Sequence, residues 1–423
     1  MAAHLSRREL LTGTALAAAL AASDPRQMAL ASVAAVPERR QDRVLVTLFL
    51  RGGADGLSIV PPVADPEYHR LRPTLSLASP QDRSAPRAAR AIPLDDYFGL
   101  NPALRSIERL YRDGLLAVLH AVGSGDRTRS HFEAMAVMER GLAGSTEGPS
   151  GGWLARAVTA DDEGGVSPLR ALAFTETMPD ILRGASGATV IRSLTDFRLH
   201  GDLETARTLQ ALYGMDPAGD ADLGLLQAGR GSLRVMDAIA ALHPAAYRPS
   251  GGAVYPPGPL GDGLRQTACL IKGRLGLEAA FLDATGWDTH VAQGRDSGWL
   301  PARLAELGQG LDAFTRDLGA EIGRVTGVVM TEFGRRAYEN SGLGTDHGRG
   351  SCMFLFGAGV AGGKVHAAWP GLAPGALEPP GDLAVTTDYR RPLYEAVRRT
   401  LGATAAAAAF PDYTHTPIGV VSA

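Results

Sequence analysis

Short, nearly continuous apolar runs restrict the fold of this chain more than any other feature of its sequence. Val44–Leu50 and Leu115–Val122 are too uniformly apolar for strands with one side in water, so both are predicted to be strands covered on two faces. Further strands are predicted at 171–175, 277–284, 327–331 and 353–356, and helices at 102–112, 130–140, 301–318, in much of 201–280 and after Asp388. The alternation of the two predicts an α/β protein with a mostly parallel, doubly wound sheet.

The first residues have the order of an export signal. Ser6-Arg7-Arg8-Glu9-Leu10-Leu11 is a twin-arginine pattern, and an uncharged, Ala/Leu-rich segment runs from Leu10 to Ala22. Ala29-Leu30-Ala31 and Val33-Ala34-Ala35 each offer a small-residue cleavage site, while a short N-terminal core helix is the alternative. We predict a signal over residues 1–35 that engages the twin-arginine export machinery, and a periplasmic or secreted mature protein.

The remainder of the chain, residues 43–423, is predicted to form one α/β domain with a helical, loop-rich insertion around 140–275. None of its apolar runs is long enough for a transmembrane helix, so stable membrane insertion after cleavage is not expected. The net charge of −3 provides no basic footprint for nucleic acid. Cys269 and Cys352 can form one disulfide, but two buried thiols fit at least as well.

Polar residues that follow the predicted strands are the candidates for chemistry, because ligands of open α/β sheets bind beyond the carboxyl ends of the strands. Asp55 lies just past the first strand, in Arg51-Gly52-Gly53-Ala54-Asp55-Gly56-Leu57. It is a candidate metal carboxylate on a loop whose glycines allow close approach. Ala-Asp-Gly is also ordinary turn sequence, which leaves a structural role open.

Ser130, in Arg127-Thr128-Arg129-Ser130-His131-Phe132-Glu133, has two compatible interpretations. Ser130 and Glu133 have the spacing of a capping box. A helix N-terminus also favours an anion, and a serine ionised by a metal at that position is a candidate nucleophile. Arg127 and Arg129 are candidates for binding the oxygens of a phosphate or sulfate group.

Asp288 and His290 form the first carboxylate–imidazole pair, within Gly286-Trp287-Asp288-Thr289-His290-Val291-Ala292-Gln293. Residues two apart on an extended backbone point to the same side, so the two side chains are predicted to converge on one ion. Histidines in other settings are interpreted as core or surface residues: His69, His120, His200, His243, His366 and His415.

The strongest candidates follow the apolar run that ends at Thr331. Glu332 closes this strand, and Asp346-His347 follows in the glycine-rich Gly344-Thr345-Asp346-His347-Gly348-Arg349-Gly350. A salt bridge from Glu332 to Arg335 or Arg336 is the alternative explanation for a charge at that position. The predicted metal ligands are therefore Asp55, Asp288, His290, Glu332, Asp346 and His347. This donor set suits Zn, Mn or Fe and, less well, Mg or Ca.

Taken in order, these motifs resemble a known family. The twin-arginine leader, Arg51–Leu57, Arg129–Phe132, Gly286–His290, Thr331–Arg335 and Thr345–Gly350 are similar to the exported bacterial family called domain of unknown function 1501. The resemblance covers nearly the whole mature chain. That family looks like a distant relative of the alkaline phosphatase and sulfatase superfamily, which implies a three-layer α/β/α sandwich with a metal site at the strand ends.

The same relationship implies roles for individual residues. Asp55 matches the first-strand carboxylate, Ser130 the nucleophile, Asp288 and His290 the middle ligands, and His347 the late histidine ligand. Glu332-Phe333 stands where the superfamily has an Asp-His pair, so one imidazole is missing from its expected place. Neither Cys269 nor Cys352 has the Cys-x-Pro-x-Arg setting of the main sulfatase type.

These observations predict a periplasmic, metal-dependent hydrolase of phosphate or sulfate esters, with Ser130 and Arg129 in catalysis. The alternative, favoured by the departure at Glu332-Phe333, is a non-catalytic envelope protein that binds an anionic glycan or a protein partner. In a third possibility the metal is purely structural.

Overall fold

The computed structural model describes residues 43–160, 169–197, 208–209, 211–213 and 220–422. The predicted export signal lies outside these residues. The chain divides into two compact units, of which the larger comprises Gln41–Ser193 and Arg248–Ala423. The other contains the helix α9 (Asp220–Ala241). The prediction of one domain with an insertion around 140–275 stays a prediction.

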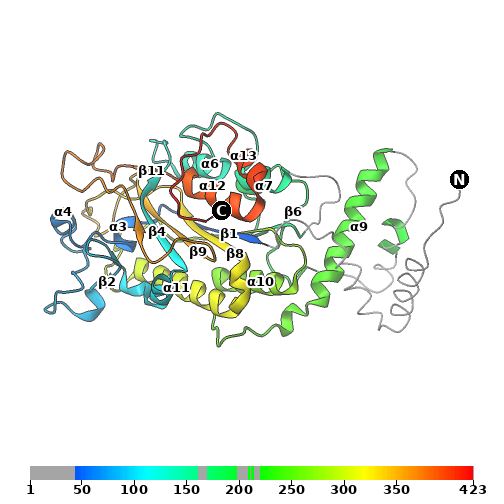
Figure 1. Cartoon of the computed structure of the whole chain (residues 1–423), viewed down its shortest axis with the longest axis horizontal. Coiled ribbons are helices and arrows are strands. Elements are labelled where there is room, and N and C mark those ends of the chain that lie inside the picture. Colours follow the sequence, from blue (N-terminus) through cyan, green and yellow to red (C-terminus); the bar gives the residue numbers. More distant parts are fainter. Residues whose placement is uncertain (1–42, 161–168, 198–207, 210, 214–219, 423) are drawn as a thin grey trace. The chain divides into compact units, whose positions relative to one another are not determined.

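A nine-stranded sheet forms the centre of the larger unit (Figure 1). Its strands, in spatial order, are β10 (Val365–His366), β4 (Leu116–Gly123), β9 (Ser351–Gly357), β8 (Val325–Thr331), β1 (Val44–Leu50), β7 (Ala279–Ala284), β5 (Ala171–Phe174) and β6 (Ala188–Val190), and β11 (Thr387–Asp388) also pairs with β4. All pairs are parallel except those of β9, which runs antiparallel to both β4 and β8. The predicted α/β class and mostly parallel sheet are therefore confirmed.

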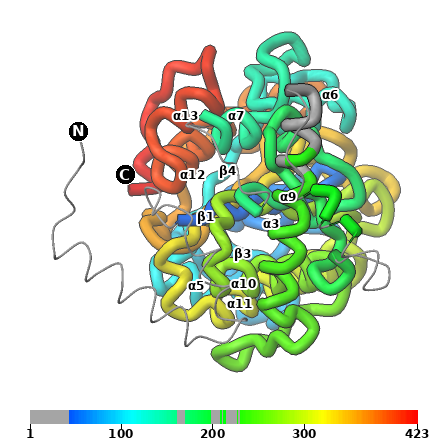
Figure 2. The backbone as a smooth tube through the Cα atoms, turned by 90° about the vertical axis from the view of Figure 1, so that its right-hand side faces the viewer, coloured from blue at the N-terminus to red at the C-terminus, as the bar shows by residue number. Residues whose placement is uncertain are grey.

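Helices cover both faces of this sheet, which explains why its central strands are mostly apolar. In Figures 1 and 2, α6 (His131–Arg140), α7 (Trp153–Thr159), α12 (Arg390–Leu401) and α13 (Ala403–Ala409) lie on one side, with α10 (Pro259–Gly273) and α11 (Trp299–Leu318) on the other. Helix α12 packs on β1 and β8, and α10 packs on β7. Every residue of β1, β4, β8 and β9 is buried.

Shorter elements fill the connections of the larger unit. They are α3 (Gly56–Ile59), α4 (Pro66–Leu71), α5 (Glu108–Arg112), the hairpin of β2 (Ile92–Pro93) and β3 (Gly99–Leu100), and 3₁₀ turns at Arg87–Ala89, Pro102–Ile107, Asp180–Leu182 and Gly319–Arg324. The helix predicted over Pro102–Arg112 is thus a 3₁₀ turn followed by α5. Asp388 was predicted to cap α12, but the N-cap residue is Tyr389, which makes no side-chain capping bond. Asp388 lies one residue earlier, and its Oδ1 accepts a hydrogen bond of 2.9 Å from Arg390 N.

The two cysteines are free thiols. Cys269 in α10 and Cys352 in β9 are both buried, so the second of the two sequence interpretations is confirmed. Burial raises the pKa of the Cys269 thiol to about 11 and that of Cys352 further still, which keeps both groups protonated.

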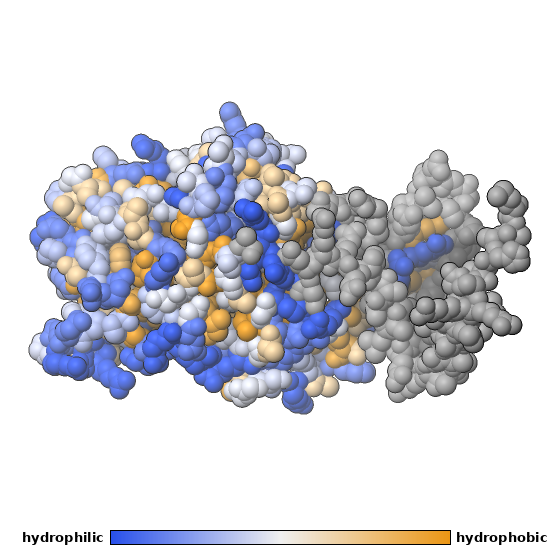
Figure 3. Space-filling view, viewed as in Figure 1, coloured by the Kyte–Doolittle hydropathy of each residue, from blue (hydrophilic) through white to orange (hydrophobic). Residues whose placement is uncertain are grey.

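The visible face of the larger unit is mainly hydrophilic, with smaller hydrophobic areas between (Figure 3). Among the described residues, no helix has the length and apolar character that crossing a membrane requires.

A buried histidine in β4 makes the stability of this unit pH-dependent. His120 Nε2–H donates to Val60 O at 2.9 Å, and its Nδ1 accepts from Ala121 N at 2.8 Å, so the neutral ring is fully satisfied. Burial lowers the pKa of His120 to about 4.

This histidine should therefore cost stability on acidification. Between the unfolded pKa near 6.5 and the folded pKa, the unfolded state binds more protons, so the contribution is complete above about pH 6.5 and falls by about 3 kcal/mol toward pH 4. Urea unfolding of the wild type and of His120→Asn at about pH 7 and pH 5 measures this. The variant should have a lower free energy of unfolding than the wild type at about pH 7, but that free energy should fall less between about pH 7 and pH 5. An equal fall in both proteins would contradict the lowered pKa of His120.

Candidate metal centre

Five chain segments meet at one edge of the sheet. Because β1, β4, β7 and β8 are mutually parallel, their carboxyl ends lie at the same edge, and antiparallel β9 begins there. His131 follows β4 at the start of α6, Asp288 and His290 follow β7, and His347 precedes β9. The topology therefore gathers residues that are far apart in the sequence, at the position where open α/β sheets bind their ligands.

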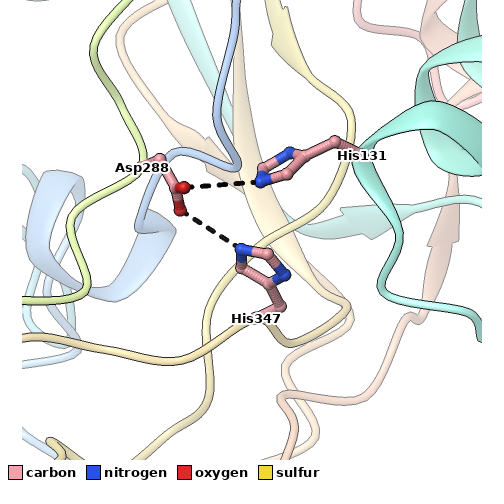
Figure 4. Close-up of side chains that lie close together, drawn as sticks. All are labelled: His131, Asp288 and His347. Carbon is pink, nitrogen blue, oxygen red and sulfur yellow. Dashed lines mark hydrogen bonds and ion pairs between the residues drawn. The ribbon is translucent and has the colours of Figure 1, made fainter.

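Three imidazole rings converge on the Asp288 carboxylate (Figure 4 shows two of them). His347 Nε2 and His290 Nε2 lie 3.2 and 3.1 Å from Asp288 Oδ1, and His131 Nε2 lies 3.6 Å from Oδ2. The ligand atoms of His131, Asp288 and His347 lie within 4.8 Å of one another, a group that could hold a metal ion.

The other ring nitrogen of each histidine faces an oxygen acceptor. His131 Nδ1 lies 2.8 Å from Glu332 Oε1, His347 Nδ1 lies 2.9 Å from Arg129 O, and His290 Nδ1 lies 3.4 Å from Asp346 Oδ1. Carbonyl and carboxylate oxygens only accept, so a protonated Nδ1 satisfies each of these contacts. The hydrogen bond to Glu332 also raises the pKa of His131. With a cation bound beside Asp288, each ring in this tautomer would direct its Nε2 lone pair to the ion. This is the tautomer in which histidines bind metals, with an outer oxygen fixing the ring.

Two of these nitrogens approach each other closely. His290 Nε2 and His347 Nε2 are 2.9 Å apart, and two lone pairs at this distance repel unless a proton or a cation lies between them. Partial burial lowers the pKa of His347, which disfavours the proton. A divalent cation is the alternative that satisfies both rings and the carboxylate together.

Asp288 remains ionised beside these rings. Partial burial opposes its charge, but the hydrogen bond and charge of Arg335 outweigh this and hold the pKa of Asp288 below its ordinary value. Arg335 Nη2 lies 2.6 Å from Asp288 Oδ1. Gly52 permits this proximity of loops, because a Cβ on Gly52 would lie 2.5 Å from Asp288 N.

Glu332, a predicted ligand, contacts a histidine of this group. Its buried carboxylate accepts from His131 Nδ1 and Gly52 N, each at 2.8 Å, and from Thr331 Oγ1 at 3.0 Å. Burial opposes ionisation, yet the bond from His131 leads the interactions that hold the pKa of Glu332 below its ordinary value. Glu332 thus contacts the Nδ1 side of His131, and the Nε2 side faces Asp288. The alternative of a salt bridge to Arg335 or Arg336 is wrong, because these arginines pair with Asp288 and Asp346.

Asp346 likewise contacts the Nδ1 side of His290, whose Nε2 faces Asp288. Besides facing His290 Nδ1, its Oδ1 accepts from Asn340 Nδ2 at 2.9 Å. The hydrogen bond from Asn340 is the main cause that lowers the pKa of Asp346. Asp346 therefore lies beside a predicted ligand, while Asp288, His290 and His347 form the converging group itself.

The structure does not bring Asp55 to this group. Its fully buried carboxylate accepts two bonds from Arg72, at 2.6 and 3.0 Å, and others from Ser58 and Gln293. Burial opposes its charge, but Arg72 outweighs this and lowers the pKa of Asp55. Among the described contacts, none joins Asp55 to Asp288 or its histidines. Here Asp55 is one half of a buried ion pair that fastens its loop.

Ser130 and Arg129, the predicted catalytic pair, lie at the start of α6. Ser130 is the half-buried N-cap residue, but its hydroxyl makes no capping bond, so the predicted capping box is absent. The Arg129 guanidinium binds Asp382 Oδ2, with Nε at 2.8 Å, and its own carbonyl accepts from His347. The structure therefore shows Arg129 orienting His347 and leaves the Ser130 hydroxyl available.

His131 is the functional residue that the sequence interpretation missed. Its ring lies 4.9 Å from the Phe333 ring and 4.4 Å from the His347 ring, centroid to centroid. The start of α6 thus brings a further imidazole to Asp288. The signal was present, because a histidine follows the candidate nucleophile directly while the expected ligand set lacks one imidazole.

Replacing Asp55 separates its structural role from a ligand role. Asp55→Asn should keep the bound metal but lower the free energy of unfolding by about 3 kcal/mol, because it leaves the buried Arg72 charge without a partner. Asp288→Asn should instead lose the metal, because it removes the carboxylate on which the histidines converge. Metal content by mass spectrometry and urea unfolding measure both effects; metal loss with unchanged stability in Asp55→Asn would restore Asp55 as a ligand.

A double-mutant cycle tests how Glu332 acts. Glu332→Gln alone should weaken metal binding by about tenfold to a hundredfold, because the charge that raises the basicity of His131 is lost. In a His131→Ala background the same substitution should have almost no further effect, since its partner is gone. Competition with a metal chelator measures these affinities. Additive losses in the double variant would mean that Glu332 contacts the ion itself.

Comparison with known families finds a match that covers part of the chain. The family described as "Protein of unknown function (DUF1501)" matches residues 265–389, the segment that carries Asp288, His290, Glu332, Asp346 and His347. No curated protein matches the chain. The comparison therefore supports this domain family for the C-terminal part of the sheet and its site.

Proposed function

We propose that this chain is a metal-dependent hydrolase of phosphate or sulfate esters. One observation carries the proposal: three imidazole Nε2 atoms converge on the Asp288 carboxylate while each Nδ1 is held by an oxygen acceptor. Histidine with carboxylate is a donor set for Zn, Mn or Fe, and suits Mg or Ca less well. Asp288 is half-exposed, so an ester can reach the centre from solvent.

The surrounding residues fit the parts of such a reaction. A bound divalent ion supplies Lewis acidity, which activates water or a hydroxyl group and offsets charge on the ester oxygens. The uncapped Ser130 hydroxyl, next to His131, is the candidate nucleophile. The exposed Arg127 has no described ion-pair partner and can bind an ester anion, whereas Arg129 is held by Asp382.

We further propose that the layered α/β unit is a distant relative of the alkaline phosphatase and sulfatase superfamily. The helices on both faces of the sheet and the site at the strand ends support this relationship. The twin-arginine leader supports export by the twin-arginine machinery to the periplasm, where an anionic ester or glycan would be met.

Purification without chelator or affinity nickel, followed by metal analysis and an aryl phosphate and aryl sulfate panel, tests this function. Wild-type protein should contain stoichiometric metal and hydrolyse at least one class of ester. His347→Ala should lose the metal and about a hundredfold or more in kcat/KM, because a ligand is removed. Ser130→Ala should keep the metal and lose turnover. His69→Ala, at an exposed histidine of α4, is the matched control and should retain both.

Other outcomes select the alternatives. Metal with saturable binding of an anionic glycan, but no turnover across the panel, would favour the non-catalytic envelope protein. Unfolding on metal removal would favour a structural ion. Full metal and activity in His347→Ala would remove the basis of the proposal.

A further inference from the structure

Large hydrophobic side chains are exposed beside the histidines of the metal centre. Phe132 directly follows His131 and is 84% exposed, while Val291 directly follows His290 and is 71% exposed. Leu343, 53% exposed, lies on the loop that packs against the Val291 segment. We call Phe132, Val291 and Leu343 the apolar rim. The described residues include only three other exposed large hydrophobic side chains, Leu212, Val254 and Trp299.

Two members of the rim are held next to each other by backbone contacts. Ala292 N donates to Gly342 O at 2.9 Å, and Gln293 N donates to Leu343 O at 3.0 Å. The two loops also meet at Gly344, where a Cβ would lie 2.3 Å from His290 O. Val291, which is adjacent to His290, and Leu343 therefore lie on two loops that are hydrogen-bonded to each other.

The backbone at this point has a conformation that disfavours the residues it carries. Leu343 has φ +58° and Ala292 has φ +47°, the left-handed region that glycine or asparagine adopts at lower cost. An exposed leucine there gains no burial to offset that cost. Retained strain of this kind is typical of binding sites, where the side chain gains its contacts when a ligand arrives.

We propose that the apolar rim binds the alkyl or aryl part of an ester whose anionic group lies at the metal centre. The inference rests on the proposed function and adds the substrate class: an amphiphilic organic monoester of phosphate or sulfate. The arrangement fits it, since Phe132 directly follows His131, Val291 directly follows His290, and both histidines face the half-exposed Asp288. An ester bound there by its anion places its carbon skeleton against the rim and removes apolar surface from water.

Calorimetric titration of the metal-loaded full chain with ethyl, butyl and hexyl phosphate tests the inference without requiring turnover. Wild-type affinity should rise about twofold per added methylene, below the roughly fourfold that complete burial of a methylene gives, because the rim is open to solvent. In a variant that combines Phe132→Ser, Val291→Ser and Leu343→Asn, this dependence on chain length should disappear. Val254→Ser, which alters another exposed valine, outside the rim, should retain it.

The outcomes separate this inference from the function on which it rests. Metal-dependent binding of ethyl phosphate with no gain from longer chains would overturn the rim assignment and leave the hydrolase proposal standing. Absence of metal-dependent binding for every alkyl phosphate and for the corresponding alkyl sulfates would overturn both. Binding of hexyl phosphate that persists without metal, or a chain-length dependence that survives in the triple variant, would show a separate apolar surface and overturn the rim.

Discussion

The geometry of this centre depends on one buried guanidinium group. Arg335, almost wholly buried, must satisfy its charge inside the protein, and it donates to Gly53 O at 2.6 Å, Thr345 O at 2.8 Å and also to Gly52 O. Its remaining bonds go to Trp287 O and to the Asp288 carboxylate. One side chain from the end of β8 therefore ties together the loops after β1 and β7 and the loop that leads into β9. A buried charge without these partners would be strongly destabilising, so the loops are held where the ligands need them.

A second buried pair supports the same edge. Asp55 and Arg72 are both inaccessible to solvent, and Gln293 donates to Asp55 Oδ2 at 2.8 Å. Gln293 ends the segment that carries His290, so the pair fixes the loop of the imidazole without approaching it. The charged residues that follow the strands thus divide into two sets, one that faces the candidate ion and one that holds the loops in place.

The central strands could be predicted because each is covered on both faces. A strand of this kind appears in the sequence as a short, nearly continuous apolar run. Val44–Leu50 matches β1 residue for residue, and the boundaries of β4 and β7 differ by one or two positions, where the chain leaves the sheet. The antiparallel direction of β9 was not predictable, since a buried strand has the same composition in either direction. The convergence of Asp288, His290 and His347 was predictable, because residues beyond the carboxyl ends of parallel strands meet at one edge of the sheet.

The hydrogen-bond and ion-pair partners of these residues were harder to predict than their places at the strand ends. A burial pattern shows that Glu332 ends a strand, but its hydrogen-bond partner His131 lies 201 residues away in the sequence, and no local spacing relates them. Asp55 was indistinguishable from a ligand for the same reason, because Arg72 comes from a segment without a periodic signal. A metal centre constrains where the nitrogen atoms lie, and any element that reaches the site can supply them. Here the start of a helix brings an imidazole to a candidate group whose other members follow or precede strands, so such a candidate is found from the spatial set of donors and their oxygen partners.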